Sequence, residues 1–218
     1  MVEKIDTLEQ FSEMITSDYP ILKDGTTSSD VFAYELKDGA LDKEHYIALC
    51  LRAIPEALTI FPEYPSCIKF VRWINKAGIL TEEILLSLVE LIKNWTEESY
   101  PNRLHERSMV ILEIAHSAKH ILSFDEIISI SPKTTKDNPW WVHILLYKHD
   151  PEKALEDLQH MPTSHFSDKV IVYIPMYLST FSKEQLKEKF VKLQLPEKEK
   201  SKLLKWLEIF AKAKPKEG

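Results

Sequence analysis

One cluster of side chains in the sequence has the spacing of a metal site. Glu113, His116 and His120 stand at positions i, i+3 and i+7, which places a carboxylate and two imidazoles on one face of a helix. Carboxylate-bridged metal sites in helical bundles use such a Glu-x-x-His pair, but they need a second pair from a facing helix, and only Asp42 with His45 approaches that pattern. The apolar stripe of the segment is centred on the opposite side. We therefore expect a solvated polar face, with no metal and no other cofactor.

Two arginines are predicted to lie where a guanidinium needs a partner. Arg103 and Arg107 fall on the apolar side of the helix expected over residues 102–122, in its first turns. An unpaired buried charge is strongly destabilising, so each arginine must reach a carboxylate or a backbone carbonyl. Two interpretations are open: a structural salt bridge to a neighbouring helix, for example to Glu90 or Glu97, or a binding contact with an anion at the end of a groove.

The last predicted helix, 197–213, has a cationic face. Lys198, Lys202 and Lys205 lie on one side of it, and its leucines lie on the other. Such a helix can contact nucleic acid, anionic lipid or an acidic partner, or it can be the solvated face of a terminal cap. Arginine, which favours bidentate phosphate contacts, is absent after residue 107, and this weakens the nucleic-acid interpretation. We take these three lysines, with the two arginines, as candidate binding residues.

No motif for nucleophilic catalysis is present in the sequence. Cys50 and Cys67 have no partner at a C-x-x-C spacing and are expected to be buried free thiols. His105-Glu106 resembles the start of a zinc-protease motif, but Met109 occupies the second histidine position. The chain has only 4 glycines, which disfavours phosphate-binding and dinucleotide-binding loops. The catalytic residues of any activity therefore stay unknown.

The elements that must position these residues are predicted to be helices. Capping residues recur before segments with a helical period: Thr7, Asp42, Thr81, Asn102, Asp150 and Ser182. The predicted helical segments are 6–16, 29–37, 42–60, 66–77, 81–97, 102–122, 123–130, 137–149, 151–160, 167–180, 182–194 and 197–213.

This succession of short-linked helices predicts an all-α fold. The layout is typical of stacked antiparallel helical hairpins, as in α-solenoids of the HEAT or TPR type, or of an irregular multi-helix bundle. No repeat period supports a particular solenoid family. We expect a single helical domain over residues 1–218, in which the break at 131–139 is the place for a subdomain boundary.

Charge and hydropathy limit the classes of partner. The 218 residues carry a net charge of −6, divided as −8 over residues 1–110 and +2 over residues 111–218. This balance gives no overall attraction to nucleic acid or anionic lipid. The N-terminal residues lack the pattern of an export signal, and the longest apolar stretch, 170–181, is too short to span a bilayer. We expect a cytoplasmic protein with no membrane partner.

These observations favour binding to another protein over catalysis. The leading hypothesis is a protein–protein interaction module, such as an adaptor, regulator or inhibitor, that binds its partner through an acidic helical surface. One alternative is a nucleic-acid-binding or processing helical-repeat protein that uses the basic C-terminal half. A second alternative is a metal-dependent helical-bundle enzyme built on Glu113, His116 and His120.

Overall fold

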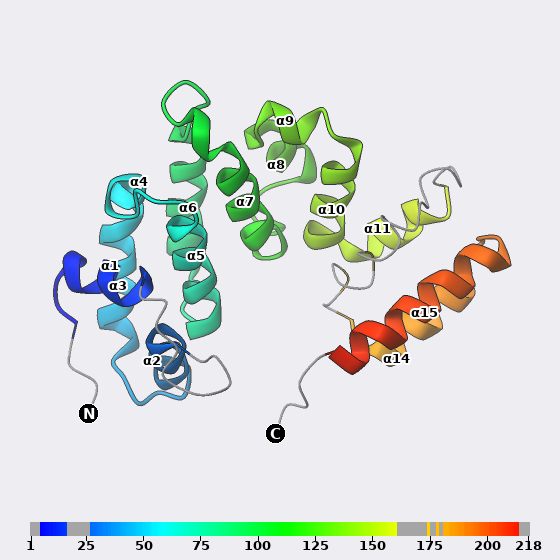
Figure 1. The fold of residues 1–218 in the computed structure, drawn as a ribbon, viewed down its shortest axis with the longest axis horizontal. Helices are drawn as coiled ribbons and strands as arrows, with labels where there is room; N and C mark the ends of the chain where they lie inside the picture. The colour runs from blue at the N-terminus through cyan, green and yellow to red at the C-terminus, as the bar shows by residue number, and fades with distance from the viewer. Residues whose placement is uncertain (1–4, 17–26, 161–173, 175–177, 179–180, 214–218) are drawn as a thin grey trace. The chain divides into compact units, whose positions relative to one another are not determined.

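The described chain is all helical. The structure is a computed structural model that describes residues 5–16, 27–160, 174, 178 and 181–213, and within these ranges every element is a helix (Figure 1). This confirms the predicted all-α fold. The helix predicted over 167–180 lies outside the described residues, apart from Ile174 and Leu178. Within the same ranges, no helix is both long and apolar enough to cross a membrane.

The chain divides into two compact units. Unit 1 comprises residues 1–117 and 130–132, and unit 2 comprises 118–129 and 133–218. The chain passes between the units after residue 117 and at both ends of the segment 130–132, so the boundary includes the start of the break that the sequence marked at 131–139. The expectation from the sequence that residues 1–218 form a single domain stays a prediction.

Unit 1 is formed by the helices of the first half of the chain. Its elements are α1 (Leu8–Thr16), α2 (Ser28–Lys37), α3 (Lys43–Ala53), the 3-10 turn η1 (Ile54–Glu56), α4 (Ala57–Ile60), α5 (Ser66–Ala77), α6 (Glu82–Asn94), the 3-10 turn η2 (Pro101–Arg103) and α7 (Leu104–Ala118). Helix α5 packs against both α1 and α2. In the core of unit 1, Phe61 stacks on Phe70 with 4.8 Å between ring centroids, and Phe11 contacts Phe70 edge to face at 5.8 Å. Aromatic packing therefore joins the first helix of the unit to its central one.

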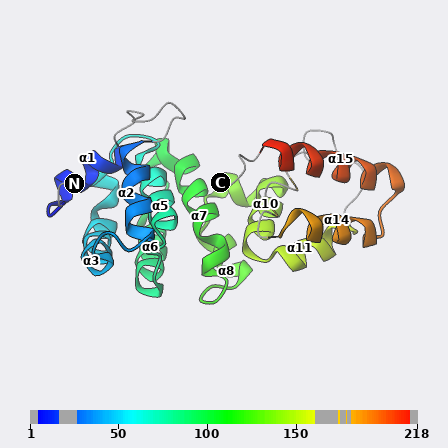
Figure 2. The ribbon, with the colours of Figure 1, turned by 90° about the horizontal axis from the view of Figure 1, so that it is seen from below.

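Unit 2 contains the remaining helices. They are α8 (Phe124–Ile130, whose last residue belongs to unit 1), α9 (Lys133–Lys136), α10 (Pro139–His149), α11 (Pro151–Leu158), α14 (Lys183–Lys192) and α15 (Glu197–Ala213). Helices α14 and α15 lie side by side, as Figures 1 and 2 both show. The core of this unit is apolar, with Phe190 and Leu203 fully buried at its centre.

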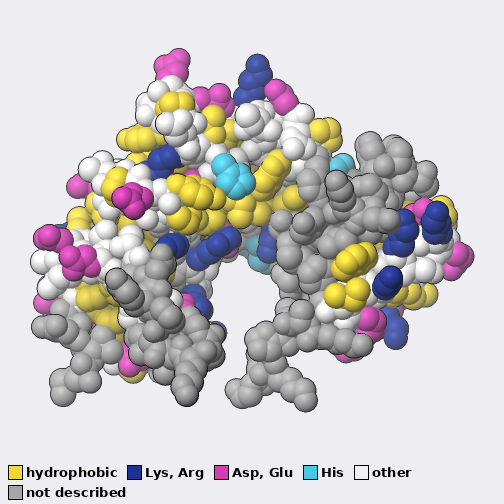
Figure 3. All heavy atoms as spheres, viewed as in Figure 1, with side chains coloured by type: hydrophobic (Ala, Val, Ile, Leu, Met, Phe, Trp, Pro, Cys, Tyr) yellow, Lys and Arg dark blue, Asp and Glu magenta, His cyan; other side chains and the backbone are white. Residues whose placement is uncertain are grey.

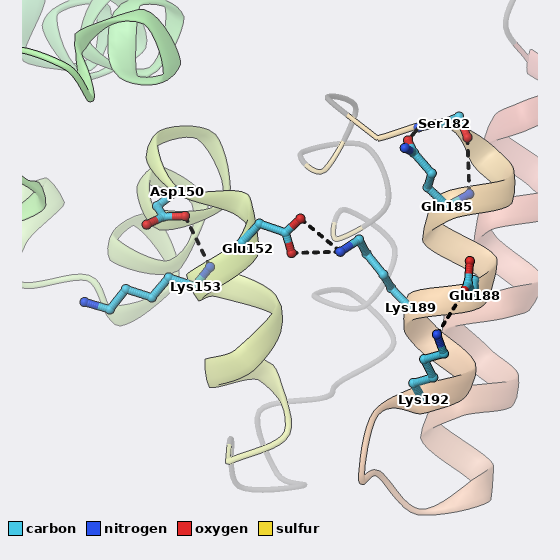
Figure 4. A network of polar contacts seen from close by, with 8 residues as sticks. All are labelled: Asp150, Glu152, Lys153, Ser182, Gln185, Glu188, Lys189 and Lys192. Carbon is cyan, nitrogen blue, oxygen red and sulfur yellow. Dashed lines mark hydrogen bonds and ion pairs between the residues drawn. The ribbon is translucent and has the colours of Figure 1, made fainter.

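An ion pair links α11 to α14 inside unit 2. Lys189 Nζ lies 2.9 and 2.8 Å from the two carboxylate oxygens of Glu152 (Figure 4). On the same helix α14, Ser182 and Gln185 form a reciprocal capping box, which fixes where the helix begins.

Most predicted helix starts are confirmed by their capping bonds. The hydroxyl of Thr81 accepts a hydrogen bond from Ile84 N at 3.2 Å, and the carboxylate of Asp42 accepts one from His45 N at 3.3 Å. Asn102 is the exception, because it lies within the 3-10 turn η2 and α7 begins at Leu104.

Two other boundaries differ from the sequence prediction. The helix expected over 42–60 is divided by η1, because Pro55 has no N–H to continue the α-helical ladder. A one-turn helix, α9, occupies part of the break at 131–139, where no helix was predicted before residue 137.

Candidate functional site

Arg103 lies in a buried polar network of unit 1. Its Nε donates to Oε2 of Glu106 at 2.8 Å, and Nη1 donates to the carbonyl oxygen of Leu58 at 3.3 Å. Nη2 lies 2.7 Å from the same Oε2 in an ion pair. The guanidinium carbon also stands 5.2 Å from the ring centroid of Trp95. A carboxylate, a carbonyl and an aromatic face therefore surround this arginine. The carboxylate partner of Arg103 is Glu106, three residues further along the chain, and not Glu90 or Glu97 of a neighbouring helix. The role of Arg103 as a binding residue stays a prediction.

Arg107 is held by a backbone carbonyl. Its Nη2 donates to the carbonyl oxygen of Ile130 at 2.6 Å, and the residue is 8% exposed. Burial lowers the pKa of the Arg107 guanidinium, and the negative charge of Glu97 partly offsets this by raising it. Arg107 is therefore placed to tie the 130–132 segment to α7, and its role as a binding residue stays a prediction.

Glu106 is the residue of this network that sequence reasoning missed. Its side chain is fully buried, and Oε1 accepts hydrogen bonds from the backbone N–H groups of Cys67 and Ile68 at 2.8 and 3.2 Å. These two groups lie in the first turn of α5, whose own N-cap residue, Pro65, makes no side-chain capping bond. Glu106 thus caps α5 from a distant helix. No local pattern signals this role, because the contact spans 38 and 39 residues of sequence.

The Glu113, His116 and His120 cluster is not assembled as a metal site. Glu113 Oε1 accepts a hydrogen bond from Arg72 Nε at 2.8 Å, while His116 and His120 are exposed. Among the described residues, no group of three or more His, Cys, Asp or Glu side chains could hold a metal ion. The carboxylate of the cluster is therefore used in an ion pair between α5 and α7.

Both cysteines are buried in unit 1. Cys50 and Cys67 are free thiols with no exposed surface, as their sequence surroundings predicted. Burial raises the pKa of both thiols; for Cys67 the value reaches about 12, with a further upward contribution from Glu106. A thiol with so high a pKa is a poor nucleophile at neutral pH. Nucleophilic catalysis by either residue has no support here.

The candidate lysines of α15 lie in unit 2. Lys198 and Lys205 are exposed and Lys202 is half-buried, while Leu203 and Leu207 on the other side of the helix are buried in the core. The same helix also carries carboxylates. Glu197 pairs with Lys200, Glu208 pairs with Lys183, and Glu199 lies on the same helix. The positive field of α15 is therefore weaker than the lysine spacing alone indicates.

The surface of unit 1 is strongly acidic. Counted over its sequence, unit 1 carries 11 Lys and Arg against 20 Asp and Glu, whereas unit 2 carries 17 against 14. Figure 3 shows Asp and Glu side chains in magenta at the outer edge of unit 1, over α1 and near the end of α6. The exposed carboxylates among its described residues are Asp6, Glu9, Glu13, Asp38, Asp42, Glu44, Glu56, Glu63, Glu82, Glu83, Glu90, Glu97 and Glu98. The exposed cations are Lys37, Arg52, Arg72, Lys76 and Lys93.

On helix α6, a large apolar side chain lies among carboxylates on the same exposed helical face. Leu86 is 51% exposed, and Glu82, Glu83 and Glu90 stand one turn away from it, at i−4, i−3 and i+4. We call these four residues the acidic α6 face. The other side of the helix is buried, with Leu88 and Ile92 fully enclosed, so the helix is held firmly while this face stays exposed.

The acidic α6 face was not predicted from the sequence, because only the apolar stripe of the same helix was considered. The signal was nevertheless present, because Leu86 falls off the stripe that Ile84, Leu88 and Ile92 define. An apolar residue outside the stripe and within a turn of several glutamates is the pattern that would have found it.

Comparison of the chain with models of protein families, with curated proteins and with solved structures finds no match in any of the three.

Proposed function

We propose that the protein is a protein-binding module whose acidic α6 face docks a basic amphipathic segment of a partner. The observation that carries the proposal is the exposed Leu86 among Glu82, Glu83 and Glu90 on a helix whose other side is buried. An apolar side chain supplies an anchor that gains free energy when it leaves water. Carboxylates around it select lysine and arginine on the partner and exclude acidic surfaces.

The electrostatic field of unit 1 supports the same partner chemistry. Exposed carboxylates outnumber exposed cations across the described part of this unit, so a basic partner is attracted before it makes contact. Lys93, which lies toward the end of α6, is 3.9 Å from Glu90 and reduces the negative charge there only in part. An adaptor, regulator or inhibitor would use such steering to reach a basic target.

The test compares variants of the acidic α6 face with a charge-matched control. The face variants are L86A and the triple charge reversal E82K/E83K/E90K; the control reverses three exposed glutamates of α1 and α3, as E9K/E13K/E44K. Each protein captures partners from a lysate of the source organism, and a partner recovered stoichiometrically with the wild type is then purified. Its affinity and association rate are measured at low and moderate salt.

The two kinds of variant are expected to change different quantities, the affinity for L86A and the association rate for the charge reversal. L86A weakens the affinity for the purified partner by about tenfold, because a leucine contact buried at an interface is lost. The triple reversal slows association by tenfold or more, and salt reduces the difference. A partner that binds both face variants as tightly as it binds the control does not use the acidic α6 face, and the proposal is then wrong.

A second candidate function uses α15 of unit 2. Lys198 and Lys205 are exposed beside Lys202 on a helix whose apolar side is fixed in the core, so nucleic acid is the alternative partner. The triple variant K198E/K202E/K205E is expected to lose salt-sensitive binding to labelled duplex and single-stranded oligonucleotides in an anisotropy titration. If the wild type binds no oligonucleotide, or if the triple variant binds as tightly as the wild type, this candidate function is wrong.

A further inference from the structure

Helix α15 carries a row of lysines that ends at an exposed apolar side chain. Lys198, Lys202, Lys205 and Ile209 stand at i, i+4, i+7 and i+11, so they share one side of the helix. The opposite side of α15 contributes leucines to the core of unit 2, whereas Ile209 is 42% exposed. Figure 3 shows hydrophobic side chains next to Lys or Arg side chains on the surface that α15 forms. We call these four residues the basic α15 stripe.

Two lysines of this stripe have no counter-ion within the described chain. Lys198 and Lys205 are exposed, and neither takes part in the ion pairs that the described residues of unit 2 form. The carboxylates of Glu197 and Glu208 on the same helix pair with other lysines. The rise of an α-helix separates Lys198 from Lys205 by roughly 10 Å along its axis. Their positive charge is therefore available to a partner.

The acidic α6 face has the complementary arrangement. Its apolar side chain, Leu86, is 51% exposed, and Glu82 and Glu83 make no ion pair in the part of the chain that the structure describes. Glu82 and Glu90 stand roughly 12 Å apart along the helix axis, which is close to the separation of the two unpaired lysines of α15. Each of the two helices therefore presents an exposed apolar side chain beside uncompensated charges, and these charges have opposite signs.

The charges of the two units favour contact between copies of the chain. Unit 1 carries 11 Lys and Arg against 20 Asp and Glu, whereas unit 2 carries 17 against 14. Unit 1 of one copy therefore attracts unit 2 of another copy and repels a second unit 1. A second copy also supplies what the acidic α6 face requires, which is a basic amphipathic helix whose apolar side is already fixed in a core.

We propose that the acidic α6 face of one copy of the chain docks the basic α15 stripe of a second copy. The inference rests on the proposed function, because it names the basic amphipathic segment that the acidic α6 face binds. Leu86 and Ile209 leave water in this contact, and the glutamates of one copy pair with the lysines of the other. Because the two surfaces differ, the contact is heterologous and links copies head to tail.

Sedimentation velocity of the purified, nuclease-treated full chain tests the contact at concentrations from about 1 µM to about 500 µM, the range of weak protein contacts. Two charge-reversal variants, E82K/E83K and K198E/K205E, each give a chain whose two faces have the same sign of charge. Their matched controls reverse two exposed glutamates of α1, as E9K/E13K, and two exposed lysines of α11 and α14, as K153E/K187E. Circular dichroism verifies that every variant keeps its helices.

The wild type is expected to form a larger species as its concentration rises, and to form less of it at moderate salt. Each of the variants E82K/E83K and K198E/K205E should raise the dissociation constant at least tenfold, because like charges meet at the contact, while both controls associate as the wild type does. The variant I209A keeps every charge and should raise the constant by about fivefold, since an apolar contact is lost.

Exchange of charges gives a recovery that a folding defect cannot produce. In an equimolar mixture of E82K/E83K with K198E/K205E, each face meets a face of opposite sign, so the mixture should associate although neither variant does so alone. The chain that carries all four reversals keeps the net charge of the wild type and should associate with itself again.

Failure of this inference is distinguishable from failure of the proposed function. The inference is overturned if the wild type stays monomeric at every concentration, if only the preparation without nuclease associates, or if the mixture of the two variants does not associate. K198E/K205E leaves the acidic α6 face intact, so it should still bind a foreign partner captured from the lysate. A monomeric wild type whose foreign partner binds L86A more weakly overturns the self-docking alone and leaves the proposed function supported.

Discussion

The two units of this chain place their charged groups in opposite ways. Unit 1 buries an ionic network, with Glu106 fully enclosed beside Arg103, and has an acidic surface. Unit 2 has an apolar core and places its ion pairs outside, such as those of Lys189 with Glu152 and of Lys183 with Glu208. The same pairing of carboxylate with cation therefore occurs in two dielectric environments within one protein.

The difference indicates what each kind of ion pair does. A buried pair has lost its hydration, so removing one partner leaves an unpaired charge in the interior at a large cost. An exposed pair is hydrated in either state and contributes little. We expect the buried pair of unit 1, Arg103 with Glu106, to contribute strongly to stability, and the exposed pairs of both units to contribute small amounts.

The largest effect is expected at Glu106. The substitution E106A leaves Arg103 buried without its carboxylate and leaves the first N–H groups of α5 without an acceptor, so it should lower the free energy of unfolding by about 3–5 kcal/mol. Urea denaturation followed by circular dichroism measures this. The matched control is E113A on the same helix, whose pair with the exposed Arg72 should contribute less than about 1 kcal/mol. Equal losses would contradict the distinction between buried and exposed pairs.

Truncation of a buried leucine in the core of unit 2 should have the next largest effect on the free energy of unfolding. L203A removes a fully buried side chain and should lower the free energy of unfolding by about 2–5 kcal/mol, against a smaller loss for L204A at the edge of the same core.

Both cysteines lie in unit 1 and are buried, so their reaction with a thiol reagent reports the opening of that unit. Thiol protection that persists in L203A under mild denaturant shows that the units unfold separately; parallel loss shows one cooperative domain.

The ion pair between α11 and α14 should contribute less. The carboxylate of Glu152 contacts Lys189 through both oxygens, yet it is 62% exposed. E152Q is expected to lower the free energy of unfolding by about 0.2–1 kcal/mol, and 1 M salt should reduce that difference further. A double-mutant cycle with K189Q isolates the pair. A coupling above about 2 kcal/mol would show that this surface pair behaves like the buried network.

The smallest expected effect is a difference between Asp30 and Glu188 in how far salt changes the pKa of the carboxyl group. Partial burial alone would raise the pKa of Asp30, but hydrogen bonds from Lys76 and Thr27 outweigh it and place the pKa below 3.8. Because the folded-state pKa is lowered, the stabilisation is present above pH 3.8 and is lost as the pH falls through the folded-state value. Hydrogen bonding and attraction from Lys192 likewise lower the pKa of Glu188, which is fully exposed. Carbon-13 titration in 1 M salt should return Glu188, more than Asp30, towards its ordinary pKa.

Local sequence patterns predicted most of the helices. Thr81, Asp150 and Ser182 each mark a helix start with an actual capping bond, because an N-cap acts within three residues of itself. The same locality explains the error at Asn102. Its side chain is suited to capping, but Pro101 precedes it and the chain makes a 3-10 turn first.

The candidate site was predictable only in part. The helical wheel placed Arg103 and Arg107 on the buried side of the helix predicted over 102–122, and both are buried, but their partners are Glu106, Leu58 and Ile130. Two of these three are backbone carbonyls, which have no side-chain identity to search for in a sequence. The prediction put Lys198, Lys202 and Lys205 on the side of α15 opposite its core leucines, and Lys198 and Lys205 are exposed. It did not identify the ion pair of Glu208 on the same helix with Lys183, because that lysine belongs to α14.

The sequence by itself determined the all-helical class, the amphipathic stripe of each helix and the acidic character of the first half, because period, capping and charge are properties of neighbouring residues. Only the tertiary structure decided that Glu106 caps α5 and that Glu113 pairs with Arg72. These contacts join residues about 40 positions apart. Their formation depends on how the helices pack, which local periodicity does not specify.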